Sequence, residues 1–291
     1  MESIPSWVPR WRPSQSGLLS PWSLNDNFAA SHGLDLHLDT SSPSSLGLRG
    51  IHVSTVWQTG PGPIASENDI TSSIDWLVGL PFADDMSPFH LEVYSRTFCA
   101  GRDAYGSRER DRTAMTLPFV AFAIYGALPD TELFRWIDMG RKCLPVTQQS
   151  ARKEDSHSSG GSWNAWNAEW NAGRASFGRV AGLAARGRRL FITANGHLGL
   201  GPESIRNGDS VYVLGGSTMP LILRPAGDSR NVLVGPSYID DLMDGQAVKA
   251  AETGNAHFGP LWSESFRQTM VDHMGGCSAR KELGVGEVSL H

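Results

Sequence analysis

The sequence predicts an α+β fold with a helical middle region, an N-terminal β-hairpin and a C-terminal small antiparallel sheet or half-barrel. Leucines alternate with polar residues before residue 65, apolar residues then recur at helical spacing, and short strand patterns separated by glycines follow. The 291 residues, 40% of them hydrophobic, can bury one large core. We therefore expect a single compact domain over residues 1–291, with five successive regions: 1–23, 24–65, 66–187, 188–248 and 249–291.

The first region, residues 1–23, is a Pro/Trp-rich arm, because four prolines forbid a helix and three tryptophans need burial or a partner. The β-hairpin region, residues 24–65, contains "GLDLHLDT", in which leucines alternate with polar residues. "LGLRGIHVSTVWQ" follows after a Ser-rich turn. This alternation predicts two antiparallel strands.

Helices dominate the middle region, residues 66–187. "SENDITSSIDWLVGLP" predicts a helix that starts at Ser66 and stops at Gly79. A second helix begins at a capping Ser87 with Pro88 in its first position, and "LPDTELFRWIDMGRKCLP" predicts a third. Charged or low-complexity loops separate these helices.

A long helix with a stripe of aromatic residues closes the middle region. In "SWNAWNAEWNAGRASFG", Trp163, Trp166 and Trp170 fall on one helical face, with Phe177 two turns further on. Such a stripe most often packs on the core. It could instead line a small-molecule pocket, because each indole carries an N–H group into an apolar wall.

The region 188–248 predicts an antiparallel β unit. Asn195 and Gly196 stand between two apolar runs, which is a hairpin signal because both turn positions favour positive φ. Three further strand patterns follow, separated by glycine-containing turns. Residues 249–291 predict one helix and a Gly-rich tail.

Composition excludes several classes of partner. A net charge of −5 without a long basic tract predicts no nucleic acid partner, and no apolar segment is long enough for a membrane span. We expect a soluble, cytoplasmic protein with three free cysteines. The sequence has neither a phosphate-binding glycine loop nor a metal-ligand motif, so we expect no cofactor and no metal.

The candidate catalytic residues are isolated donors and bases. Tyr212 and Tyr238 lie in predicted strands, where their hydroxyls could donate hydrogen bonds at the end of an apolar face. His197 follows the hairpin turn and is a third candidate donor. A weaker alternative is a hydrolase or dehydratase that uses His197 with Asp240; an ordinary surface or capping role is commoner for such residues.

A family resemblance rests on "GRRLFITANGHLGLGPESIRNGDSVYVLGGSTMPLILRPAGDSRNVLVGPSYIDDLMDGQAV" and on "PSWVPRWRP" near the start. Both segments resemble the C-terminal region of fungal heterokaryon-incompatibility (HET) domain proteins, although Arg10 replaces the usual acidic residue. We expect a stand-alone member without the HET domain itself. Similar stand-alone chains occur in fungal metabolite pathways, including a norbornene-forming Diels–Alderase of sordaricin-type diterpenoid biosynthesis.

The resemblance implies two alternative functions. The first is a cofactor-independent cyclase that folds a hydrophobic fungal metabolite, such as a terpenoid, in an aromatic pocket between the helical region and the C-terminal sheet. Holding a flexible substrate in its reactive conformation can contribute several kcal/mol, up to about 7–11 in intramolecular cases. The second is a non-enzymatic protein-interaction module, which predicts an exposed apolar surface in place of an enclosed cavity.

Overall fold

The structure is a computed structural model of the chain. It describes residues 28–41, 45–80, 87–103, 105–126, 135–139, 142, 161–227, 230–254, 259–261, 263, 266, 268 and 285–290. The contacts divide the chain into two compact units, a β unit (residues 1–63 and 187–291) and a helical unit (residues 64–186). We describe each unit by itself; the single domain expected from the sequence stays a prediction.

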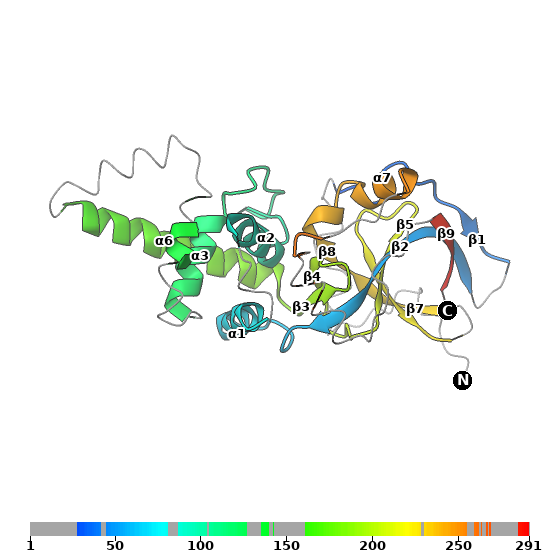
Figure 1. Ribbon diagram of the computed structural model, residues 1–291, viewed down its shortest axis with the longest axis horizontal. Helices are drawn as coiled ribbons and strands as arrows, with labels where there is room; N and C mark the ends of the chain where they lie inside the picture. The colour runs from blue at the N-terminus through cyan, green and yellow to red at the C-terminus, as the bar shows by residue number, and fades with distance from the viewer. Residues whose placement is uncertain are drawn as a thin grey trace. The chain divides into compact units, whose positions relative to one another are not determined.

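The helical unit contains four long helices in its described part. They are α1 (Glu67–Val78), α2 (Pro88–Cys99), α3 (Thr116–Gly126) and α6 (Gly161–Ala184). Helices α2 and α3 both pack against α6 (Figure 1). Their contact surface is apolar, so these helices form one core.

The predicted helix boundaries are largely confirmed. Helix α1 starts with a capping box, in which Ser66 and Asp69 bond each other's backbone N–H groups, and it ends at Gly79. Helix α2 starts after Ser87 with Pro88 in its first turn, as predicted. Of the third predicted helix, residues 135–139 are helical, and most of the remainder lies outside the described residues.

Aromatic rings form the core of the helical unit. Phe177 of α6 is fully buried, and its ring centroid lies 5.2 Å from that of Phe119 and 5.3 Å from that of Phe122. Phe98 of α2 completes the cluster at 6.2 Å from Phe177. These separations are typical of packed aromatic pairs, so the C-terminal half of the α6 stripe stabilises the core.

The β unit is built around one long strand. Strand β2 (Leu46–Thr59) pairs antiparallel with β1 (Leu38–Asp39), which gives the N-terminal pairing expected from the sequence. The other strands are β3 (Arg188–Thr193), β4 (Leu198–Pro202), β5 (Ser210–Leu214), β6 (Leu221–Pro225), β7 (Arg230–Pro236), β8 (Tyr238–Ile239) and β9 (Val285–Leu290). Together they form a nine-stranded sheet, which with the helices confirms the α+β class.

Five of these strands close into a ring through their pairings. Strand β2 pairs with β5 on one edge and with β9 on the other, and β6 and β7 complete the circuit. An aliphatic cluster draws residues from β2, β5, β6 and β9: Leu48, Leu214, Leu223, Val288 and Leu290. A second cluster packs the opposite face, where Val211 and Val213 alternate with the side chains of the first.

The structure corrects two expectations for the β unit. Asn195 does not have positive φ; only Gly196 does, at 79°. The amide of Gly196 donates to the Thr193 carbonyl and the Thr193 amide donates to the His197 carbonyl, so the loop has three residues and needs one left-handed position.

The second correction concerns the C-terminal region. Helix α7 (Gln246–Glu252) begins inside region 188–248, which was expected as an antiparallel β unit, and residues 285–290 form strand β9 rather than a glycine-rich tail. The helix predicted from residues 257–276 falls mostly outside the described residues. In the part of the chain that the structure describes, no helix is long and apolar enough to cross a membrane.

Candidate functional site

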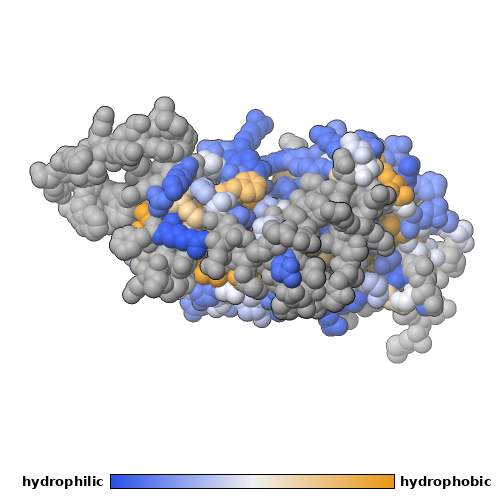
Figure 2. Space-filling model, in the orientation of Figure 1, coloured by the Kyte–Doolittle hydropathy of each residue, from blue (hydrophilic) through white to orange (hydrophobic). Residues whose placement is uncertain are grey.

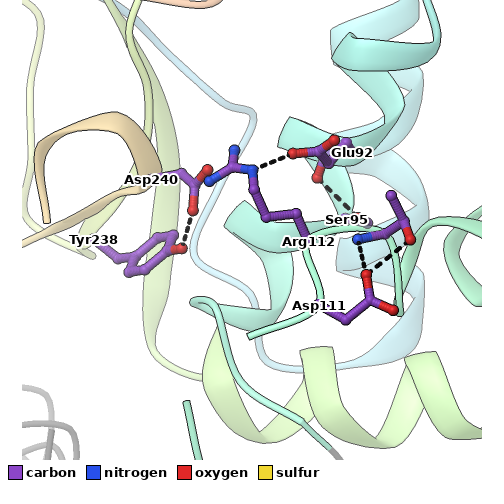
Figure 3. A network of polar contacts seen from close by, with 7 residues as sticks. Glu92, Ser95, Asp111, Arg112, Tyr238 and Asp240 are labelled. Atoms are coloured by element: carbon purple, nitrogen blue, oxygen red, sulfur yellow. Dashed lines mark hydrogen bonds and ion pairs between the residues drawn. The ribbon is translucent and has the colours of Figure 1, made fainter. Parts of the chain in front are cut away.

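A buried polar cluster joins strands β4 and β8. It consists of His197, Tyr238, Asp240 and Asp241. The imidazole Nδ1 of His197 lies 2.8 Å from Oδ2 of Asp241, and the Tyr238 hydroxyl donates to Oδ1 of Asp240 at 2.6 Å. His197, Tyr238 and Asp240 are buried, whereas Asp241 is partly exposed (Figure 3 shows the Tyr238–Asp240 contact).

The strand register places this cluster. In the antiparallel pair of β4 and β8, Gly199 lies opposite Ile239 and Leu200 lies opposite Tyr238. Continuing that register by two residues brings His197 opposite Asp241. The sequence places both residues near strand ends, but it does not state which strands pair.

A backbone contact fixes the turn next to this cluster. The amide of Gly259 donates to the Asn195 carbonyl at 2.8 Å, and the amide of Leu261 donates to the Gly196 carbonyl at 3.0 Å. A side chain at Gly259 would collide with the backbone of His197 and Gly196. The close approach of the two backbones explains the glycine at this position.

The cluster therefore uses its donors internally. The Tyr238 hydroxyl has one proton, and it is donated to Asp240. The carboxylate that contacts the imidazole belongs to Asp241. The hydrolase or dehydratase hypothesis instead pairs His197 with Asp240. Donation by Tyr238 or His197 to a substrate stays a prediction.

Tyr212 lies on a different part of the β unit. Its side chain packs against the aliphatic cluster of the ring, and its ring meets that of His52 at a centroid distance of 5.1 Å in an edge-on arrangement. Partial burial raises the pKa of the Tyr212 hydroxyl above its ordinary value. Tyr212 thus remains a neutral donor at physiological pH. No described contact joins it to the polar cluster that contains Tyr238 and His197.

The predicted substrate-binding residues all lie in the helical unit. Trp163 and Trp166 belong to helix α6, but their side chains are outside the described part. Trp170 is buried, and Phe177 lies in the aromatic core described above. The predicted pocket combines residues of the two units, and it stays a prediction.

Charged side chains of the helical unit line a shallow surface hollow. Arg112 forms an ion pair with Glu92 of α2 (Figure 3), and the Arg102 guanidinium donates to the Gly106 carbonyl. Arginines and carboxylates alternate around this hollow: Arg96, Arg102, Glu109, Asp111 and Arg112. Because both signs of charge are present, the hollow does not indicate an anion site. Among the residues that the structure describes, no three His, Cys, Asp or Glu side chains gather as metal ligands.

An exposed apolar edge on the β unit was not among the predicted sites. Leu36 is 57% exposed and Leu38 is 52% exposed, although both belong to the alternating segment that predicted a strand. Hydrophilic residues predominate among the coloured atoms of Figure 2, and the apolar areas visible there are small and separate. The only sequence signal for this edge was the alternation of leucines with polar residues. Alternation predicts a strand with one apolar face, but it does not predict whether other strands or helices cover that face.

Two comparisons relate the chain to known proteins. Residues 146–258 match the family described as the Het-6 beta-barrel domain. Over 278 residues the chain is also 26% identical to the heterokaryon incompatibility protein 6, OR allele, of Neurospora crassa; the match covers 86% of this chain. It covers only 38% of that relative, so the chain spans less than half of the relative's length. No solved structure matches.

These matches support a relationship to fungal HET proteins, as the resemblance implies. Of the five strands of the ring, β5, β6 and β7 lie within the matched residues, whereas β2 and β9 lie outside them. Neither match supports the finer similarity to a Diels–Alderase.

Proposed function

We propose that this chain is a non-enzymatic interaction module that binds another polypeptide. The observation that carries this proposal is the exposed pair of leucines on the segment of strand β1, Leu36 and Leu38. Leu38 lies in strand β1 and Leu36 lies two residues before it, so two exposed apolar side chains occur close together along this segment. Leaving such side chains in water is unfavourable, and covering them with a partner would stabilise a complex.

The rest of the described β unit agrees with this proposal. Aliphatic side chains fill the ring of strands, and the polar cluster around His197 is buried and internally hydrogen-bonded. Both features are what a rigid scaffold requires. The likeness to a heterokaryon incompatibility protein is compatible with this proposal.

The proposal is tested by affinity capture with matched variants. The full-length tagged chain is expressed in Neurospora crassa as wild type, as a Leu36→Asp/Leu38→Asp double variant and as Leu183→Asp. Leu183 is 73% exposed on helix α6, so its variant adds a charge to an exposed leucine outside strand β1. A partner identified by mass spectrometry is then purified, and its affinity for each form is measured by titration calorimetry.

We expect one or more polypeptides that bind the wild type and Leu183→Asp equally and lose at least tenfold in affinity for the double variant. Circular dichroism of each variant checks that the fold is retained. Absence of any partner above the tag control, or equal binding by all three forms, would contradict the proposal.

The second candidate is the cofactor-independent cyclase acting on a hydrophobic metabolite. Its support is the aromatic stripe that the sequence places on one face of helix α6; of the described members, Trp170 is buried and Phe177 packs in the aromatic core. Incubation of the purified chain with metabolite extracts, followed by mass spectrometry, tests it. A product of unchanged mass and altered retention is expected of a cyclase, and Trp166→Ala should change the product ratio.

A further inference from the structure

We propose that strand β1 binds an extended segment in which apolar and basic residues alternate, and that this segment pairs with β1 as an additional strand. The inference rests on the proposed function and names the chemistry of the partner. It draws on three features of residues 35–39: an available edge, an apolar face and an acidic face.

The edge of β1 is available within the described part of the chain. Leu38 pairs with Leu48 and Asp39 pairs with Gly47, so β2 occupies one edge of β1. No other described strand pairs with β1. A strand with one edge unpaired carries backbone N–H and C=O groups that can pair with another chain.

Two glycines of neighbouring segments leave room for residues 35–39 to approach closely. A side chain at Gly215 would collide with the backbone carbonyl of Asp35, and one at Gly47 would press on the Asp39 side chain. The segment therefore lies against two glycines that leave room for its backbone. Such support keeps a short strand extended before a partner arrives, which lowers the entropy cost of binding.

The apolar face of β1 continues the interior packing of the ring. Leu38, Leu48 and Val288 lie in one row across β1, β2 and β9. Leu48 and Val288 are buried, whereas Leu38 and its neighbour Leu36 are about half exposed. An apolar residue of an added strand would extend this row by one position.

The opposite face of β1 is acidic. Asp39 of β1 is exposed there, Asp35 is exposed three residues before the strand, and Glu287 of β9 is exposed two strands away, directly opposite the exposed Arg49 of β2. Hydrogen bonds from the backbone and side chain of Ser41 hold the pKa of Asp39 below its ordinary value, so this carboxylate is charged at neutral pH. The excess negative charge favours lysine or arginine on the added strand.

The same charges disfavour a second copy of this chain as the partner. Antiparallel pairing of two β1 segments about His37 would place Asp35 of each copy opposite Asp39 of the other. Parallel pairing in register would place each aspartate opposite itself. Like charges directly opposed across strands are destabilising, so the fitting partner is a different, basic segment.

The test uses three synthetic nine-residue peptides and the full-length chain. The first peptide alternates lysine with valine, the second alternates glutamate with valine, and the third repeats the lysine peptide with methyl groups on alternate backbone nitrogens. Fluorescence anisotropy gives their affinities at low salt, and hydrogen exchange locates the site. The chain is used as wild type, as Leu38→Asp and as Asp35→Asn/Asp39→Asn.

We expect the lysine peptide to bind about tenfold more tightly than the glutamate peptide, because several cross-strand charge pairs add their effects. It should slow exchange of the amides of residues 36–39, weaken with added salt, and lose affinity when its backbone is methylated. The Asp35→Asn/Asp39→Asn variant should bind the two charged peptides about equally, and Leu38→Asp should lose the methylation-sensitive binding and the protection of residues 36–39.

Equal binding of the lysine and glutamate peptides by the wild type, protection elsewhere, or no binding at millimolar peptide would overturn the inference. A dimer of the chain that light scattering detects and Leu38→Asp abolishes would overturn it as well. If instead the captured partner of the previous section still depends on Leu36 and Leu38, the proposed function stands and only the strand-pairing mode is wrong.

Discussion

The imidazole Nδ1 of His197 lies 2.8 Å from Oδ2 of Asp241, at the point where the β4–β8 register brings the two residues opposite each other. The imidazole is fully buried, so this pair ties the end of the β3–β4 turn to the residues that follow strand β8. The geometry of this pair resembles the His–Asp pair of a catalytic site, but its burial favours a structural role.

Replacement of His197 by alanine should therefore destabilise the β unit. The variant leaves a cavity and removes the partner of Asp241, which together cost about 2–4 kcal/mol. Hydrogen exchange of the β4 amides in increasing urea measures the loss. His32→Ala, at an exposed position in the same unit, is the control and should change stability by less than about 0.5 kcal/mol.

Gly259→Ala should disrupt the contact between residues 259–261 and the hairpin turn. A methyl group there would overlap the backbone of His197 and Gly196, which cannot move without breaking the turn. Gly286 of strand β9 is the matched control, because a Cβ there meets no atom within 4 Å. Thermal unfolding should show a clear loss for Gly259→Ala and little change for Gly286→Ala; equal melting temperatures would refute the packing account.

A buried ion pair anchors strand β5 to β6. Arg224 contacts Asp209 through two parallel bonds, Nε to Oδ1 at 2.8 Å and Nη2 to Oδ2 at 2.9 Å, and Asp209 is almost fully buried. Asp209→Asn should lower the free energy of unfolding by about 2 kcal/mol. The loss is smaller than for a fully buried pair because Arg224 is partly exposed. The exposed pair of Asp138 and Lys142 offers a comparison, and Asp138→Asn should cost less than about 0.5 kcal/mol.

The capping box of helix α1 makes the start of this helix sensitive to acid. Hydrogen bonds from the Ser66 side chain, the Ala65 backbone and the Ser66 backbone lower the pKa of Asp69 in the folded state. A lowered carboxyl pKa stabilises the folded state above the unfolded pKa of about 4, and this stabilisation is lost as the pH falls through the folded value.

Amide exchange in the first turn of α1 should therefore be slower in the wild type than in Asp69→Asn at pH 6. After correction for intrinsic exchange rates, the difference should disappear near pH 2. A difference that persists at pH 2 would mean that the carboxylate charge is not the cause.

Local signals in the sequence identified most elements but not their long-range pairing. Ser66, Ser87 and Pro88 marked helix starts because capping depends on residues a few positions apart. The ring could not be predicted, because β2 pairs with strands more than 150 residues away and the last strand, β9, follows a glycine-rich segment.

The candidate site shows the same limit. The sequence placed His197 and the two aspartates near strand ends, but the choice of Asp241 as the imidazole partner depends on the β4–β8 register. The alternation around Leu36 and Leu38 predicted a strand, of which the structure forms only Leu38–Asp39, and the exposure of the two leucines depends on which strands cover them. Burial is a property of the assembled sheet, so local patterns do not determine it.

Photo-crosslinking from strand β1 tests the central claim most directly. The full-length chain carries p-benzoylphenylalanine in place of Leu38, or in place of Leu183 as the control, and is irradiated inside the fungal cell. The account predicts a polypeptide adduct from position 38, mapped by mass spectrometry to an extended basic segment of the partner, and none of comparable yield from position 183. No polypeptide adduct from position 38, or equal adducts from both positions, would contradict it.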